Sequence, residues 1–128
     1  MAILDHTTGV LFSGDLIFHK RTLTTPHADI HKWLSTIDSL YKLTFSVLIP
    51  GHGPVSQDKQ ALAEMTDYLM WLDATLREAA NHGSSMTDVM QLTLPERFQS
   101  NTLLKQEFTK SVVHLFSRYE NNVFKRVN

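Results

Sequence analysis

Asp15 is the first residue of the chain whose type and position suggest chemistry. It follows a near-continuous apolar run, residues 9–13, of the kind that forms strands buried on both faces. A carboxylate at the carboxyl end of a strand is well placed to bind a ligand in an open α/β sheet. For the tripeptide Ser13-Gly14-Asp15 taken alone, however, a simple turn is the favoured interpretation.

His52 is the second such residue, and it lies in the loop Pro50-Gly51-His52-Gly53-Pro54 after the apolar run 46–49. Glycines on both sides leave the imidazole approachable, and the two prolines restrict the freedom of the loop. A tight turn with an incidental histidine would explain the glycines and prolines. It would not explain the histidine between them, so a functional role is favoured here.

Asp15 and His52 together indicate a metal site more strongly than either residue alone. If both follow strands of a parallel or mixed sheet, both can project from the same edge. A carboxylate oxygen and an imidazole nitrogen are ordinary zinc ligands. A zinc site uses three or four ligands, so the residues by themselves predict two ligands of a larger site.

The elements that must position these residues follow from the apolar patterning, which predicts an α+β chain with three or four strands and then mainly helices. The helices supply one layer against the strands, and a second layer is missing from the pattern. Gly83 is a predicted C-cap, and the spacing of Ser85 and Asp88 predicts a capping box. The predicted strands are 2–4, 9–13, 16–18 and 46–49, the last stopped by Pro50; the main helices are about 30–41, 57–80 and 102–126.

Composition excludes several classes of function. The 128 residues are 42% hydrophobic and carry a net charge of −1, which predicts one globular domain, or a piece of one, without a basic surface for nucleic acid or anionic membrane. The absence of cysteine excludes disulfides, a cysteine zinc site and a thiol nucleophile. The chain shows neither an apolar run long enough to span a bilayer nor the pattern of an export signal.

The two loops, residues 9–15 and 50–55, with a tryptophan-bearing helix between them, resemble the last two metal motifs of the metallo-β-lactamase superfamily. More narrowly, the chain is similar to the quinoprotein relay system or SoxH-like zinc metallohydrolases, and residues 115–123 resemble the C-terminal helical tail of that subgroup. The resemblance implies an αββα sandwich with two zinc ions at one edge. It also implies that Asp15 bridges the two metals and that His52 is the last histidine ligand, and it makes a periplasmic parent protein plausible.

The departure from the family pattern is equally specific. The His-x-His-x-Asp-His motif and the histidine after it precede the aspartate in the family, and neither occurs in this chain. We therefore expect residues 1–128 to be a partial domain, the C-terminal half of the sandwich, with no catalytic residue of its own and no hydrolysis by itself. A small-molecule substrate is expected only if the missing N-terminal half completes the site.

One alternative function is a non-catalytic interaction module that forms a homodimer through its exposed sheet. Another is an independent helical protein whose two loops match the family by chance, which the pairing of the loops disfavours. His27 belongs to a segment that also resembles the SoxH-like subgroup, so it is a candidate substrate-binding residue at the pocket mouth. His6, His19 and His82 are predicted to be turn, loop or helix-end residues at the surface, and Trp33 and Trp71 to be core residues.

Overall fold

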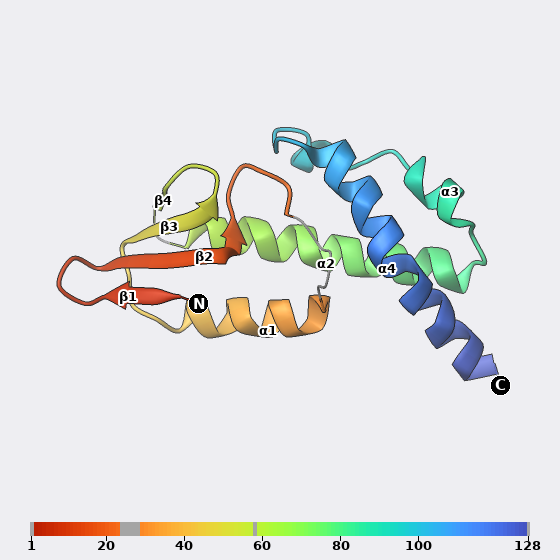
Figure 1. The fold of residues 1–128 in the computed structure, drawn as a ribbon, viewed down its shortest axis with the longest axis horizontal. Coiled ribbons are helices and arrows are strands. Elements are labelled where there is room, and N and C mark those ends of the chain that lie inside the picture. The colour runs from red at the N-terminus through yellow and green to blue at the C-terminus, as the bar shows by residue number, and fades with distance from the viewer. Residues whose placement is uncertain (1, 24–28, 58, 128) are drawn as a thin grey trace.

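The computed structural model describes residues 2–23, 29–57 and 59–127, without the side chains of 126 and 127. The predicted α+β class is confirmed, because these residues form one sheet and several helices (Figure 1). The strands are β1 (Ile3–Asp5), β2 (Val10–Phe18), β3 (Val47–His52) and β4 (Ser56–Gln57); the helices are α1 (Ile30–Tyr41), α2 (Gln60–Asn81), α3 (Met86–Met90), the short 3-10 helix η1 (Glu96–Phe98) and α4 (Leu104–Val127).

The sheet is mixed, with the strand order β1-β2-β3-β4. β2 and β3 run parallel, and the outer strands β1 and β4 pair antiparallel with them. A parallel pair needs a crossover connection, and α1 provides it between β2 and β3. The carboxyl ends of the two central strands therefore lie at the same end of the sheet, where His52 is the last residue of β3 and Asp15 lies three residues before the end of β2.

The predicted turn at Ser13-Gly14-Asp15 is wrong, because β2 continues through these residues to Phe18. The strand pairing is irregular on both sides of Gly14 and then resumes at Phe18, which pairs with His52. Such a bulge absorbs extra residues and bends a strand without ending it. Gly-Asp is typical of turns, but neighbouring strand β3 supplies pairing partners that local sequence cannot reveal.

The predicted stop at Pro50 is also wrong, since β3 extends to His52 and Pro50 pairs with Gly14. Proline is tolerated in a strand at a bulge, where no N–H is needed for the ladder. The two-residue strand β4, which follows the loop, was not predicted from the sequence.

The helices form where their apolar residues recur at helical spacing, and these residues make up their buried faces. Asp29 is the N-cap of α1 and accepts a hydrogen bond from the Lys32 backbone N–H at 3.1 Å. The capping box of α3 is confirmed, with Ser85 and Asp88 bonded in both directions. Gly83 has a φ of 71° just past the end of α2, as a C-cap requires. The buried aliphatic face of α2 includes Ala61, Leu62, Met65, Leu69, Leu72 and Leu76.

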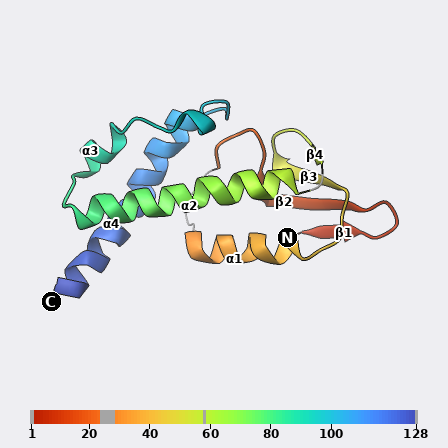
Figure 2. The ribbon, with the colours of Figure 1, turned by 180° about the vertical axis from the view of Figure 1, so that it is seen from behind.

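The core lies between one face of the sheet and the helices. α2 lies behind the sheet in Figure 1 and in front of it in Figure 2, so it covers one face, with α1 beside it. Leu11 of β2 and Leu48 of β3 are fully buried on this side. α4 packs across α2 farther along the molecule, where Trp71 contacts the Phe108 ring. Trp33 and Trp71 are both packed against the core, as predicted.

The other face of the sheet remains largely open. Ile3, Phe12 and Ile49 are partners across β1, β2 and β3, so their side chains share this face. Ile3 is 60% exposed and Phe12 is 44% exposed. The apolar run of β2 is thus buried on one face only among the residues described, and the row of three apolar side chains marks where a further layer could pack.

Candidate metal site

Asp15 and His52 meet at the surface of the sheet. The Asp15 Oδ1 atom lies 3.3 Å from the His52 Nε2 atom. The Asp15 side chain is 85% exposed and that of His52 is 44% exposed. The structure therefore brings together the two residues that the sequence predicts as metal ligands, although 37 positions separate them in the chain.

Asp15 lies in the irregular segment of β2. Gly14 pairs with Pro50 and Phe18 pairs with His52, so four steps along β2 correspond to two steps along β3. If the regular register of Phe12 with Ile49 continued, Asp15 would lie directly opposite His52, but the shifts place Phe18 there instead. The Asp15 carboxylate therefore meets the His52 imidazole from the bulged segment and not as its ladder partner.

Gly51 is required for the close approach of the two strands. A Cβ atom at this position would lie 2.6 Å from the Gly14 backbone carbonyl and 2.7 Å from the Asp15 Oδ1 atom. Gly53 has a φ of 98°, and a Cβ there would overlap the His19 carbonyl oxygen. The glycines that flank His52 therefore admit the backbone of β2, in addition to leaving the imidazole accessible as the sequence suggested.

The His52 ring is held by Phe18, its strand partner. The two rings stack with centroids 4.7 Å apart and an interplanar angle of 14°. Trp33 of α1 contacts the Phe18 ring edge-on, and its indole N–H donates to the Leu16 carbonyl oxygen at 2.8 Å. The orientation of the imidazole thus depends on a contact chain that reaches back to α1.

His19 holds the loop around His52 through hydrogen bonds to its backbone. The prediction that His19 lies at the surface is wrong. It is only 4% exposed, and its backbone N–H donates to the His52 carbonyl oxygen at 2.9 Å. Its Nδ1 atom lies 2.9 Å from the Pro54 carbonyl oxygen, which can only accept, so Nδ1 carries a proton. Its Nε2 atom faces the Glu64 carboxylate at 3.4 Å. Neither the burial nor these partners have a local sequence signal, because all three partners lie more than 30 residues away.

Among the described residues, His6, His31 and His82 do not add to this site. His27, the candidate substrate-binding residue, lies outside the described residues. His6 is in the turn between β1 and β2 and His82 is exposed at the end of α2, as predicted. His31 faces the Asp73 carboxylate of α2 at 3.5 Å instead of Asp15 or His52.

Two donor atoms are therefore what the described residues offer at this site. Within residues 2–23, 29–57 and 59–127, no three histidine, aspartate or glutamate side chains group closely enough to hold a metal ion. Among the same residues, no helix is long and apolar enough to cross a membrane. The chain matches no protein-family model.

Proposed function

We propose that the chain is part of a zinc-dependent metallohydrolase domain of the metallo-β-lactamase type, and that Asp15 and His52 are two of its metal ligands. The observation that carries the proposal is the 3.3 Å approach of Asp15 Oδ1 to His52 Nε2 from two neighbouring parallel strands. Both residues belong to the two segments, residues 9–15 and 50–55, whose sequence resembles the last two metal motifs of that superfamily.

The donor atoms fit a shared zinc ion. Zinc lies about 2.0–2.2 Å from nitrogen and oxygen ligands in a tetrahedral site, so two ligands of one ion are about 3.4 Å apart. The distance between Asp15 and His52 agrees with this value. An exposed ion pair also forms at this distance and contributes roughly 0–1 kcal/mol, so metal binding must be tested directly.

The chain's own residues would hold and orient the ligands. The stacking of Phe18 fixes the plane of the His52 ring, and Gly51 allows the Asp15 carboxylate to lie beside it. A bound zinc would supply the chemistry of this class, since it lowers the pKa of its water to about 7 and polarises the substrate carbonyl. The exposure of Asp15 leaves the approach to the pair open on the solvent side.

Two ligands are fewer than a zinc site needs, so we propose that these 128 residues do not catalyse hydrolysis alone. The other ligands would come from the half of the sandwich that carries the His-x-His-x-Asp-His motif. The open sheet face supports this arrangement, because the apolar row Ile3, Phe12 and Ile49 offers a surface for a second layer.

The same face supports a second candidate function, an interaction module that dimerises. Exposed apolar rows across three strands are uncommon on soluble monomers, and a two-fold dimer would cover them with a second copy. In this case the pair of Asp15 and His52 would be a surface ion pair without a catalytic role.

Zinc content after dialysis against a zinc buffer tests the first candidate. We expect the wild-type chain to bind zinc only weakly, through its two ligands, and the Asp15→Ala/His52→Ala variant to bind less, because both ligands are removed. The matched control is His6→Ala/Asp38→Ala, which removes an exposed histidine and an exposed aspartate that are far apart in the fold. Equal zinc content in wild type and double variant would refute the metal site.

Two further measurements test whether the chain is inactive alone and whether it forms a dimer. Hydrolysis of a lactam, ester or thioester by the purified chain, abolished by a chelator, would contradict the proposal that it is inactive alone. Analytical ultracentrifugation of the wild type and of Phe12→Lys tests whether the chain is a dimerising interaction module. A dimer that Phe12→Lys converts to monomer favours the second candidate, and an aggregating chain favours the partial domain.

A further inference from the structure

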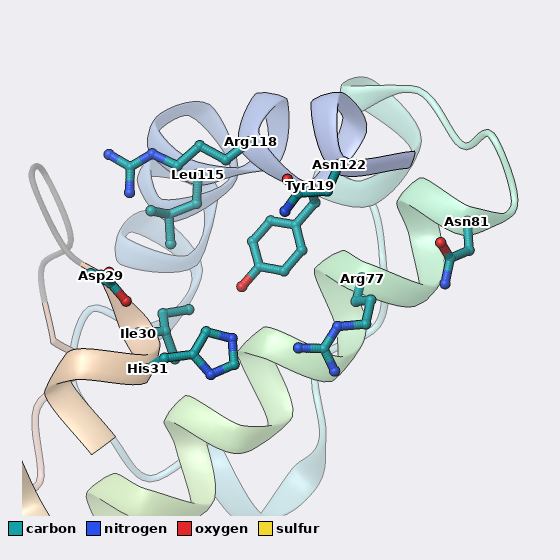
Figure 3. A pocket seen from close by; sticks show the side chains of 9 residues that line it. All are labelled: Asp29, Ile30, His31, Arg77, Asn81, Leu115, Arg118, Tyr119 and Asn122. Atoms are coloured by element: carbon teal, nitrogen blue, oxygen red, sulfur yellow. The ribbon is translucent and has the colours of Figure 1, made fainter. Parts of the chain in front are cut away.

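A second polar region lies apart from the Asp15 and His52 pair, between α1, α2 and α4. It is a cavity of about 400 Å³, within the range of small-molecule sites. Figure 3 shows the His31 ring, the Arg77 guanidinium and the Tyr119 hydroxyl turned toward the same space. These three side chains come from three different helices, so the cavity exists only in the folded chain.

A buried carboxylate beneath the cavity fixes these groups. Asp73 of α2 accepts from the Tyr119 hydroxyl at 2.6 Å and from the Arg77 Nη2 group at 2.5 Å. His31 Nε2 lies 3.5 Å from the same carboxylate. Asp73 thus holds a guanidinium, a phenol and an imidazole in set positions, which is the pre-organisation that a binding site needs.

Arg77 retains capacity for a ligand. A guanidinium has five N–H donors in a planar fork, and its Nη2 group serves Asp73. About half of the Arg77 side chain is exposed toward the cavity side of α2. A carboxylate matches the geometry of this fork and forms charge-assisted hydrogen bonds with it.

The charges around the cavity favour a ligand with a single negative charge. The lining contains two guanidinium groups, Arg77 and Arg118, and one carboxylate, Asp29, which caps α1. Arg118 lies at the rim with its guanidinium turned away from His31 and Tyr119 (Figure 3). With Asp73 beneath, this balance favours a single negative charge over a phosphate dianion, which the two carboxylates would repel.

The cavity also has an apolar side, formed by Ile30 and Leu115. Both are core residues that are at most 4% exposed, so the apolar surface they present is small and is fixed by packing. A ligand that satisfies both sides has one carboxylate and a compact apolar body. We infer that this cavity binds a small organic carboxylate, with Arg77 as the residue that recognises the carboxylate and Ile30 and Leu115 against the apolar part.

Titration of the isotope-labelled full chain with benzoate, followed by NMR, tests the inference. We expect saturable shifts at His31, Arg77 and Tyr119. Benzamide, which has the same shape without the charge, should bind at least about tenfold more weakly, because charged hydrogen bonds are lost. Absence of saturable shifts at these residues, or equal binding of benzamide, would overturn the inference without the use of any variant.

A matched pair of variants tests the role of the guanidinium. Arg77→Lys keeps the charge beside Asp73 but removes the fork, and we expect about tenfold weaker benzoate binding. Arg97→Lys is the control, because Arg97 also pairs with an aspartate of α2, Asp67, outside this cavity. If Arg77→Lys does not fold, His31→Gln at an exposed position should still weaken binding. Unchanged affinity in the folded cavity variants would contradict the assignment.

Discussion

Two Asp–His pairs of this chain have nearly equal separations and different surroundings. Asp15 and His52 are 3.3 Å apart at the sheet, and His31 and Asp73 are 3.5 Å apart between helices. The Asp15 side chain is 85% exposed, whereas that of Asp73 is 11% exposed.

The partners differ as well. Asp73 also accepts from Tyr119 and Arg77, so its oxygens are occupied by groups from two helices. The comparison teaches that distance alone does not identify a metal-binding pair. A carboxylate surrounded by protein donors has its oxygens occupied, and an exposed one at a strand bulge remains accessible to a metal ion.

The largest effect is expected for Asp73→Ala. The change removes a buried carboxylate and leaves the Tyr119 hydroxyl and the half-exposed Arg77 guanidinium without their common acceptor. Hydrogen bonds to charged groups contribute about 1.5–3 kcal/mol each, so we expect a loss of about 3 kcal/mol in the free energy of unfolding by urea.

Asp67→Ala is the matched control, because Asp67 is an exposed aspartate of the same helix that pairs with Arg97. It should lose less than about 1 kcal/mol. Equal losses for the two variants would contradict the distinction between a buried and an exposed carboxylate.

The second effect concerns the approach of the strands at the exposed pair. Gly51→Ala would place a Cβ atom 2.6 Å from the Gly14 carbonyl, and such overlap in packed structure costs about 1–3 kcal/mol. We expect a lower unfolding midpoint in urea and loss of zinc retention, since Asp15 must move away from His52.

Gly83→Ala provides the comparison for a glycine with open space around its Cβ position. Its cost is conformational only, because its φ is 71°. Zinc retention should be unchanged in Gly83→Ala; a parallel loss there would mean that the strand contact is not responsible.

A third test removes one of the hydrogen bonds to the buried Asp73 carboxylate. Tyr119→Phe deletes the 2.6 Å hydrogen bond to Asp73, and we expect a loss of roughly 1.5 kcal/mol at neutral pH. Tyr41→Phe, at a partly exposed tyrosine of α1, should change stability by less than half of that amount.

Because of Tyr119, we also expect the stability of the fold to fall at alkaline pH. Burial, and then the hydrogen bond to Asp73, raise the pKa of Tyr119 above its ordinary value of 10.0. Because the folded chain holds this proton more tightly, the stabilisation is complete below pH 10 and is lost as the pH rises through the folded-state pKa. Burial raises the pKa of Tyr68 in the same direction, so Tyr119→Phe should reduce the slope of stability against pH without abolishing it.

The smallest effect is expected for the exposed pair. Asp15→Ala should change the free energy of unfolding by less than about 1 kcal/mol, and high salt should reduce the difference further. A loss as large as that of Asp73→Ala would show that the pair of Asp15 and His52 is structural, which would weaken the case for a metal site.

The sequence by itself determined the helices and the pattern of apolar residues. Helical faces, the capping box of Ser85 and Asp88 and the C-cap glycine Gly83 are local features, fixed by residues at most a few positions apart. The sequence also selected Asp15 and His52, because their residue types and flanking glycines stand out within short segments.

The tertiary structure alone decided what surrounds these residues. The continuity of β2 through Gly14, the burial of His19 and the contacts of Asp73 with His31 and Tyr119 depend on segments that lie far apart in the chain. Strand pairing and the burial of polar groups are settled by such distant contacts. Local periodicity carries no record of them, and for this reason the bulged strand segment that carries Asp15 appeared in the sequence only as a turn.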